Sequence, residues 1–434
     1  MARKEFNKKV FAGKLVVIIF LGIILGISCL FSTSIEKALG IGYKDSGYAS
    51  VEEIEDSNLV LHYIDVGQGD STFIMLPDGT NMLIDAGTSS AGKHVVAYIE
   101  SLGITQIDYF VVTHSDSDHS GGAKKVFDAF EIKNIYRPFQ ISVDKSGNPT
   151  KFEMLGDYYE AGNKCNIVST STYEKFITAA YNEKYSEGGV EKNSQVYVSY
   201  DGLKITSSLT SENFSIEFFA PLLRDGAEAF NTDTKTIGYP TKFYGKEGSE
   251  SNNNASPVIL LEYNQSSFVF TGDLNTSVED EVVDSLSTEE KNRFSDVDIF
   301  SAGHHGSSGS NGENLINLMK ANYIVVSVGK NNSYEHPHQE FLDRITSYSH
   351  NVDDYILRTD ELGDISFGFN SLNKLVYAAN KSGYGETVLW WQIALGLFVV
   401  ISFIVISVKV TKNKKATAKR AASKVRQVSK LYKK

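Results

Sequence analysis

The stretch Thr113-His114-Ser115-Asp116-Ser117-Asp118-His119-Ser120-Gly121-Gly122 carries the strongest signal in this chain. It follows the apolar residues 107–112, which have the pattern of a buried strand, and it places four potential metal ligands within six residues. A loop at the end of a strand can turn alternate side chains toward one centre, and imidazole and carboxylate groups together suit Zn²⁺, Mn²⁺ or Fe²⁺. A solvated polar turn is the competing interpretation. Two His and two Asp at alternating spacing favour the metal site.

Histidine is clustered elsewhere as well. Six of the nine His lie in three groups, each at the end of an expected strand or the start of an expected helix: His114 with His119, His304 with His305, and His336 with His338. Such clustering is typical of metal and acid–base sites. Because adjacent side chains usually point in opposite directions, we expect one residue of the His304–His305 pair to bind a metal and the other to contact substrate or brace the site.

Further candidates come from two other segments. Asp273 follows the apolar residues 268–270 and a glycine, so its carboxylate can enter the site and bridge two metals; capping of the next helix is the alternative. Ser307 and Ser308 are candidates for substrate binding. Either His336 or His338 can contact substrate, with an ordinary exposed turn as the alternative.

The apolar pattern predicts a mixed α/β domain. Strands are expected at 59–65, 71–76, 81–85, 107–113, 132–136, 214–220, 258–263, 267–271, 297–302, 323–328, 355–358 and 365–369, and helices at 94–102, 120–130, 172–181, 278–286, 313–320 and 339–348. Strand meanders come first, strand–helix alternation follows, and the order then repeats. An αββα four-layer sandwich, with two mixed sheets and helices outside both, accommodates this order.

Both ends of the chain carry uncharged apolar runs, at 15–31 and 388–408. About 20 apolar residues span a bilayer and about 17 still suffice. We therefore predict two transmembrane helices flanking the domain, with a cleaved signal peptide as the alternative for the first run. Basic residues precede the first run and follow the second, and such flanks stay in the cytoplasm. Both termini are expected in the cytoplasm, with the intervening domain outside the cell.

Charge and cysteine content bear on partners. The basic tail at 409–434 is expected to contact anionic lipid of the bilayer, with nucleic-acid binding as the alternative. Since the whole chain has a net charge of −11 and both ends are basic, the segment between them is strongly acidic. The two cysteines are Cys29, in the first apolar run, and Cys165. We expect no disulfide within the exported domain, so its core, with metal as a possible addition, must hold the fold.

The motif at 114–119 resembles the HxHxDH signature of the metallo-β-lactamase superfamily, with Asp116 in place of the second His. With it, five further motifs occur in an order similar to that of the C-terminal hydrolase domain of the ComEC family of competence proteins: 65–70 (DVGQGD), 83–87 (LIDAG), 271–273 (TGD), 304–307 (HHGS) and 336–338 (HPH). The resemblance covers residues 59 to 370. It implies the αββα fold and a metal-dependent hydrolase with one or two divalent ions, Zn or Mn.

The same resemblance implies roles for individual residues. His114 and Asp116 would bind one metal, Asp118 and His119 the other, Asp273 would bridge them, and His304 or His305 would complete a shell. Asp85 would brace the loop at 114–119, and Asp65 and Asp70 would support the site from outside the ligand set. Two departures matter. No His lies between positions 119 and 304, so the usual third-motif His is absent, and two apolar runs are too few for DNA transport through this chain alone.

The domain organisation expected from these features has six parts. They are a cytoplasmic segment with its anchor at 1–33, a linker at 34–57, the hydrolase domain at 58–370 with insertions at 138–212 and 222–255, a linker at 371–387, a transmembrane helix at 388–408 and a basic tail at 409–434.

The function expected is metal-assisted hydrolysis of a phosphodiester. Asp118 would orient or deprotonate the attacking water, and His336 or His338 would donate to the leaving group. DNA fits the family, but an acidic domain repels a polyanion. A cell-wall polymer such as a teichoic acid or its phosphocholine is the alternative substrate. A non-catalytic, metal-stabilised module that binds an envelope protein is the second class, and a β-lactam hydrolase is disfavoured by the missing His.

Overall fold

The computed structural model describes residues 54, 57–138, 170–207, 214–222, 252–347, 355–370, 373–380 and 416–423. The chain separates into two compact units, Gly47–Tyr384 and the paired ends Met1–Ser46 and Gly385–Lys434. In the unit formed by the two ends, the described residues are 416–423, which are helical and exposed. The other unit contains both sheets.

The first sheet has eight strands in the order β17-β16-β1-β2-β3-β4-β5-β8. Its first half is antiparallel, while β3, β4, β5 and β8 run parallel. The strands are β1 Val60–Tyr63, β2 Thr72–Met75, β3 Asn81–Ile84, β4 Gln106–Val111, β5 Glu131–Arg137, β8 Gln195–Val198, β16 Asp364–Phe369 and β17 Leu375–Asn380. The change from antiparallel to parallel pairing places the carboxyl ends of β3 and β4 at one edge, where the loop at 113–122 begins.

The second sheet has seven strands in the order β15-β14-β13-β12-β11-β10-β9. It too changes direction, since β9 to β12 pair antiparallel and β12 to β15 pair parallel. The strands are β9 Lys204–Thr206, β10 Phe214–Phe218, β11 Ile259–Tyr263, β12 Ser266–Phe270, β13 Ile299–Ser301, β14 Tyr323–Val326 and β15 Ile356–Arg358. A hairpin turn at residues 264–265 joins β11 to β12, with Asn264 in the left-handed region (φ 56°).

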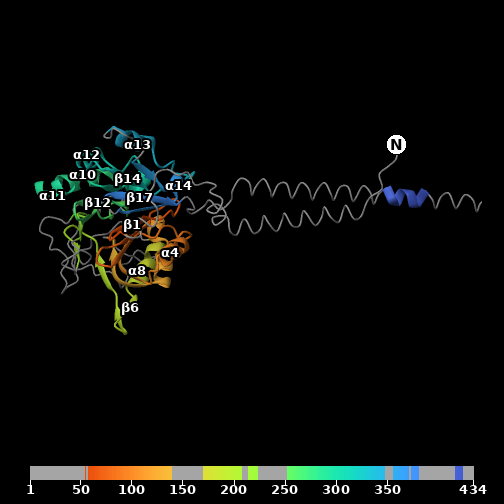
Figure 1. The fold of residues 1–434 in the computed structure, drawn as a ribbon, viewed down its shortest axis with the longest axis horizontal. Helices are drawn as coiled ribbons and strands as arrows, with labels where there is room; N and C mark the ends of the chain where they lie inside the picture. The colour runs from red at the N-terminus through yellow and green to blue at the C-terminus, as the bar shows by residue number, and fades with distance from the viewer. Residues whose placement is uncertain are drawn as a thin grey trace, which may run out of the picture. The chain divides into compact units, whose positions relative to one another are not determined.

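Helices cover the outer face of each sheet (Figure 1). Helices α4 (Gly92–Ser101), α6 (Ala123–Ala129) and α8 (Ser171–Ala180) bury apolar side chains against the first sheet. On the second sheet lie α10 (Thr276–Ser285), α12 (Glu313–Met319) and α13 (Gln339–Thr346). Between the sheets, side chains of both meet in a third apolar layer, where the rings of Tyr63 and Phe270 stack at 6.4 Å and those of Tyr136 and Phe218 at 5.7 Å. The fold is thus mixed α/β with two facing sheets, as the sequence predicts.

Shorter elements complete the described chain. They are α5 Ser117–Ser120, α11 Thr288–Arg293, α14 Thr359–Leu362, the 3₁₀ turn η1 Gly303–Gly306 and a separate two-stranded hairpin of β6 Lys184–Glu187 and β7 Val190–Asn193. Within the described residues, no helix has both the length and the apolar character needed to cross a bilayer. The two apolar runs, at 15–31 and 388–408, lie outside those residues, so the predicted transmembrane helices stay a prediction.

Packed residues lie beyond both predicted ends of the hydrolase domain. Strand β17 lies beyond residue 370 and pairs antiparallel with β16 over six residues, so the segment at 371–387 is not wholly a linker. At the other end, Ile54 is buried in a small cluster with Val60 and Ala378, which places packed residues inside the predicted linker at 34–57. Strand β17 has the apolar sequence LVYAAN and lies at the edge of its sheet with β16 as its partner, but it comes after the last strand that the pattern predicts. The segments 138–212 and 222–255 stay a prediction as insertions, but the first contributes β8 and β9 to the sheets.

The helix expected at 120–130 is present as α6 but begins at Ala123, and the short helix α5 precedes it across Gly121 and Gly122. A Cβ atom on Gly122 would lie 2.0 Å from the carbonyl oxygen of Ala86, and one on Gly121 would lie 2.1 Å from that of Ser117. The backbone approach at this point is too close for any side chain, so the break holds the loop at 114–119 against the end of β3.

Candidate metal centre

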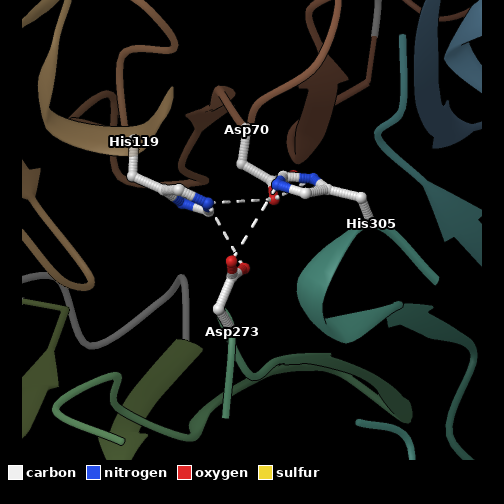
Figure 2. Close-up of side chains that lie close together, drawn as sticks. All are labelled: Asp70, His119, Asp273 and His305. Atoms are coloured by element: carbon white, nitrogen blue, oxygen red, sulfur yellow. Dashed lines mark ion pairs between the residues drawn. The ribbon is translucent and has the colours of Figure 1, made fainter. Parts of the chain in front are cut away.

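Four loops meet at one edge of the two sheets. His119 follows β4, Asp273 follows β12, His305 follows β13, and Asp70 lies between β1 and β2. One ligand atom from each of these four side chains lies within 4.8 Å of the others, and Figure 2 shows them pointing toward a common point. Ligand sites of α/β proteins commonly lie at the carboxyl ends of strands. The cluster therefore forms where the two sheets bring those ends together.

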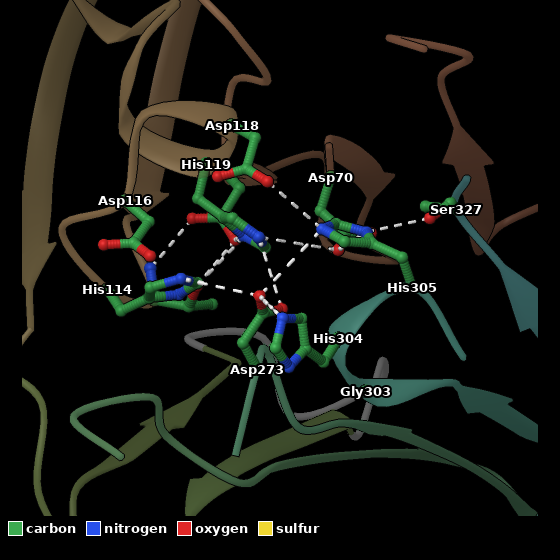
Figure 3. Close-up of polar contacts among 12 residues, drawn as sticks. Asp70, His114, Asp116, Asp118, His119, Asp273, Gly303, His304, His305 and Ser327 are labelled. Carbon is green, nitrogen blue, oxygen red and sulfur yellow. Dashed lines mark hydrogen bonds and ion pairs between the residues drawn. The ribbon is translucent and has the colours of Figure 1, made fainter. Parts of the chain in front are cut away.

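Asp273 is at the centre of the cluster (Figure 3). Its Oδ1 lies 3.3 Å from His119 Nε2, and its Oδ2 lies 3.7 Å from His114 Nε2 and 3.6 Å from His304 Nε2. Ligand atoms around a tetrahedral ion at about 2.1 Å are separated by about 3.4 Å, which these distances approach. The two oxygens face different histidines, which is the placement that a bridging carboxylate needs.

The residues present fit a divalent cation. The buried atoms His114 Nε2, His119 Nε2, His305 Nε2 and Asp273 Oδ1 make no hydrogen bond. Buried polar atoms normally have partners, since leaving one without costs about 1–3 kcal/mol. Three imidazole nitrogens and a carboxylate oxygen that face one another without hydrogen-bond partners are the arrangement that a metal ion satisfies.

The orientations of the His119 and His305 rings are set by contacts at their Nδ1 atoms. His119 Nδ1 lies 2.7 Å from Asp85 Oδ2, and Asp85 also accepts hydrogen bonds from Thr113 N and Thr113 Oγ1. His305 Nδ1 lies 2.9 Å from Ser327 O. A proton on each Nδ1 leaves each Nε2 free to bind metal, an arrangement common around metal-bound histidine. Asp85 therefore contacts both His119 and Thr113, and the bracing role that the resemblance implies for it stays a prediction.

His304 and His305 do not point in opposite directions as expected. Both have left-handed backbone conformations (φ 50° and 54°), and both rings face Asp273 (Figure 3). Such a conformation is unfavourable for residues other than Gly and has to be held by its surroundings. Here the side chain of Asn311 accepts from Gly303 N (2.7 Å) and donates to Gly303 O (2.9 Å). The tertiary structure thus overrides the local preference on which the expectation rested.

The position of Asp70 also differs from the expectation, which placed it outside the ligand set. Its Oδ2 lies 3.3 Å from His305 Nδ1 and 3.9 Å from His119 Nε2. The chain can turn this carboxylate inward because Gly69 adopts φ 150°, and a Cβ there would lie 2.4 Å from Asp118 O. Burial raises the pKa of Asp70, an effect that the nearby His305 and His119 oppose.

His114 and Asp116 occupy the other side of Asp273. His114 Nδ1 contacts Ser256 Oγ at 3.3 Å, and Ser256 Oγ also accepts from Asp273 N, so one serine connects the two loops. Asp116 is outside the four-residue cluster and accepts from Asn252 Nδ2 at 3.0 Å. That bond engages Oδ1 and leaves Oδ2 of Asp116, so the ligand role predicted for Asp116 stays a prediction. Neither Ser256 nor Asn252 carries a sequence signal, since each lies more than 130 positions from its partner in the 114–119 loop.

Asp118 lies beside the cluster, with its Oδ2 3.4 Å from His305 Nε2 and 27% of its side chain exposed. Burial would raise its pKa, but the neighbouring His305 and His119 outweigh that and lower it. An ionised, partly exposed carboxylate at this place can accept a hydrogen bond from a bound water.

The remaining candidates, His336, His338, Ser307 and Ser308, lie in two loops next to the cluster. The His336 ring lies 5.4 Å from that of His304, and its pKa is lowered to about 4 by burial and by the neighbouring histidines. Both ring nitrogens of His338 are engaged within the loop, Nδ1 with Ser308 N and Ser308 Oγ and Nε2 with Tyr334 O. Ser307 Oγ accepts from Gly309 N. The side chains of His338, Ser307 and Ser308 are thus hydrogen-bonded to neighbouring loop groups, whereas the His336 ring lies beside His304 and His305.

Asp65 supports the turn that carries Asp70. Its carboxylate accepts from Gly67 N at 3.0 Å, and its own N–H donates to Asp364 at 2.8 Å. Burial raises the pKa of Asp65 to about 6, partly offset by the bond from Gly67. The residue thus stands outside the cluster, as the sequence suggests.

Metal binding should release protons and strengthen with pH. Although burial alone would lower it, the carboxylates of Asp273, Asp118 and Asp70 raise the pKa of His305 to about 9, so the metal-free ring is protonated at pH 7. A ligand nitrogen must be deprotonated, so we expect the apparent affinity for Zn²⁺ to rise as pH increases from 6 toward about 9 and then to level off. Calorimetric titrations at pH 7 in buffers of different ionisation enthalpy measure the protons released. A His94→Gln variant, altered outside the cluster, should release the same number, and buffer-independent heats in the wild-type chain would contradict the prediction.

Comparison with known proteins agrees with this geometry. Residues 64–143 match the family model of the metallo-beta-lactamase superfamily. The chain is 27% identical over 327 residues to ComE operon protein 3 of Bacillus subtilis (strain 168), covering 71% of this chain and 33% of that protein. It is 24% identical over 318 residues to competence protein ComA of Neisseria gonorrhoeae, covering 73% of this chain and 33% of that protein. The chain therefore spans about a third of the length of these relatives.

Among solved structures, the metallo-beta-lactamase SMB-1 in complex with mercaptoacetic acid is similar, with 13% identity, a TM-score of 0.30, and coverage of 67% of this chain and 94% of that one. The predicted resemblance to the metallo-β-lactamase superfamily and to the ComEC family is confirmed by the family model and the relatives. The chain has the mixed α/β metallo-β-lactamase fold with a candidate divalent-metal cluster.

Proposed function

We propose that this metallo-β-lactamase-like chain is a phosphodiesterase, anchored in the cell membrane with its catalytic domain outside the cell and both termini in the cytoplasm. The observation that carries the hydrolase part is the set of buried imidazole and carboxylate atoms without partners around Asp273. The anchoring rests on the two apolar runs and their basic flanks, which make the lipid bilayer the first partner.

In this proposal, different residues of the chain bind the cation, orient the attacking water and contact the leaving group. His119, His305, Asp273 and Asp70 would hold the cation, and His114 and His304 flank the second oxygen of Asp273. When bound, a divalent metal supplies charge to stabilise a developing oxyanion and to lower the pKa of a water. Asp118 stays ionised and is placed to orient that water by accepting its hydrogen bond. His336 is neutral near pH 7, so it would donate a hydrogen bond to the leaving group rather than transfer a proton.

A phosphodiester is the substrate class that this arrangement favours. Asp273 presents one oxygen to His119 and the other to His114 and His304, and a carboxylate between two metals suits in-line displacement at phosphorus. The phosphodiester is either nucleic acid or a cell-wall polymer such as a teichoic acid with its phosphocholine. The net charge of −11 is unfavourable for a polyanion and has to be offset by local contacts.

Assays on the metal-loaded full chain in detergent test the proposal. A diester panel with Mn²⁺ or Zn²⁺ should include a nucleotide diester, glycerophosphocholine and a β-lactam, and turnover should be confined to the diesters. His114→Ala should lose both turnover and metal, while His94→Gln keeps both. Absence of turnover on every diester, together with unchanged metal content in His114→Ala, would reject the proposal.

One observation favours a second candidate, a non-catalytic metal-stabilised module that binds an envelope protein. Asp116 lies outside the four-residue cluster, so among the described residues one of the two metal positions has fewer ligands close together. Such a module would gain thermal stability from metal without hydrolysing any diester in the panel.

A further inference from the structure

Tyr334 stands out on the surface beside the metal cluster. Among the residues that the structure describes, Val190 and Tyr334 are the exposed large hydrophobic side chains, and Tyr334 is 62% exposed. Val190 begins β7 in the separate two-stranded hairpin, whereas Tyr334 lies two positions before His336. A single exposed apolar residue is ordinary. Tyr334 differs in lying close to the metal cluster and in belonging to a loop that is held by several hydrogen bonds.

A series of ring contacts leads from Tyr334 to the cluster. Its ring stacks on that of His336 at 5.7 Å with an interplanar angle of 27°. The His336 ring in turn lies 5.4 Å from His304 and 6.2 Å from His305. The exposed aromatic ring is therefore separated from a residue of the metal cluster by one imidazole.

The loop that carries Tyr334 is held by specific hydrogen bonds. Asn332 Oδ1 accepts from Tyr334 N (3.1 Å) and His336 N (3.0 Å), and Asn332 Nδ2 donates to Gly329 O (2.9 Å) and His336 O (2.7 Å). From the other sheet, Gln68 Oε1 accepts from Gly329 N at 3.1 Å. An aromatic ring fixed in this way loses little conformational freedom when a ligand packs on it.

We propose that the face of Tyr334 is a stacking subsite for a base of single-stranded nucleic acid whose phosphodiester lies at the metal cluster. Every nucleobase has a planar face that stacks on an aromatic side chain, whereas the backbone of a polyol-phosphate polymer has none. A phosphocholine group would instead contact the ring as a cation, and glycerophosphocholine as a competitor of oligonucleotide binding distinguishes that case. Stacking also needs no positive charge, so it provides affinity on an acidic chain. A single strand is required because the bases of a duplex are stacked on one another. The inference rests on the proposed phosphodiesterase and selects nucleic acid over a wall polymer as its substrate.

Kinetics on matched substrates test the subsite. For a single-stranded oligonucleotide, Tyr334→Ala should raise KM by about 5- to 150-fold with kcat nearly unchanged, as expected for loss of one stacked base. Tyr334→Phe should keep the wild-type KM because the stacking face remains. For an oligomer of the same length with abasic sugars, Tyr334→Ala should change nothing, and Val190→Ala should change nothing on either substrate. An equal loss on both oligomers, or no loss on either, overturns the proposal.

A binding measurement separates this inference from the proposed activity. An oligonucleotide containing 2-aminopurine should lose fluorescence on the wild-type chain and on Tyr334→Phe but not on Tyr334→Ala, whether or not hydrolysis occurs. Quenching without turnover in the presence of Ca²⁺, Mn²⁺ or Zn²⁺ would support the subsite and reject the phosphodiesterase. Turnover with the same quenching in Tyr334→Ala as in wild type would reject the subsite and leave the phosphodiesterase standing.

Discussion

An Asp273→Asn variant is expected to lose most of its bound metal and about 10³-fold or more in kcat/KM on any diester that the wild-type chain hydrolyses. The carboxylate of Asp273 lies 3.3 Å from His119 Nε2, 3.6 Å from His304 Nε2 and 3.7 Å from His114 Nε2. The substitution therefore replaces the anionic group that all three histidines face with a neutral amide. Metal-ion charge stabilisation contributes several kcal/mol to a transition state, which corresponds to this loss of rate. Elemental analysis of the purified variant and steady-state kinetics measure the two effects.

The amide has the same shape as the carboxylate, so the variant should keep its fold, as circular dichroism can verify. It should also lower the pKa of His119 and His305, because the carboxylate of Asp273 raises both. Asp284→Asn, an exposed substitution on the neighbouring helix α10, is the matched control and should keep metal and turnover. Wild-type metal content and rate in Asp273→Asn would remove the residue from the centre of the site.

A Gly122→Ala variant is expected to be destabilised by about 3 kcal/mol. The added Cβ would lie 2.0 Å from Ala86 O and 3.0 Å from Gly92 Cα, and both neighbours are backbone atoms that cannot rotate away. Overpacking of this kind costs about 1–3 kcal/mol and occasionally more. Two backbone hydrogen bonds lie at this contact, from Ala86 N to His119 O and from Gly122 N to Gly87 O. The added methyl group should therefore also displace the loop at 114–119. The midpoint of denaturant unfolding measures the change.

Gly309→Ala provides the comparison within another loop of the site. The Cβ added there meets Ser307 Oγ alone, at 3.6 Å, which is ordinary contact. Its unfolding free energy should stay within about 0.5 kcal/mol of wild type, as for most exposed substitutions. Equal stability of the two alanine variants would show that the backbone approach at Gly122 does not constrain the fold.

Much of the fold could be predicted because its signals are local. The strands at 81–84, 259–263 and 323–326 each combine an apolar run with a turn residue at one end, and the sequence predicts them within two residues. The hairpin β6–β7 could not be predicted, since its residues are largely exposed and carry no alternation. The break at Gly121–Gly122 was missed because the helical pattern continues through it. The sequence also gives no sign of the close approach of Ala86, 36 residues earlier, which leaves no room for a side chain at Gly122.

For the candidate site, the sequence likewise predicts which residues take part but not how their side chains are oriented. For His338 the sequence predicts a catalytic role, yet both its ring nitrogens are taken by Ser308 and Tyr334 within the folded loop. For Asp70 it predicts support, yet the glycine before it turns the carboxylate toward His305. In both cases the sequence identifies a residue that can bind metal or transfer a proton. The contacts that orient its side chain are formed with residues brought close by the fold.

The sequence by itself determined which loop carries candidate metal ligands, because His114 to His119 lie close together in the chain and their spacing after a strand is a local property. Only the tertiary structure decided that Asp70, Asp273 and His305 join His119, since strands far apart in sequence had to be placed at one edge of two sheets. It also decided that both His304 and His305 face Asp273, because Asn311 holds their backbone in a conformation that no local preference favours.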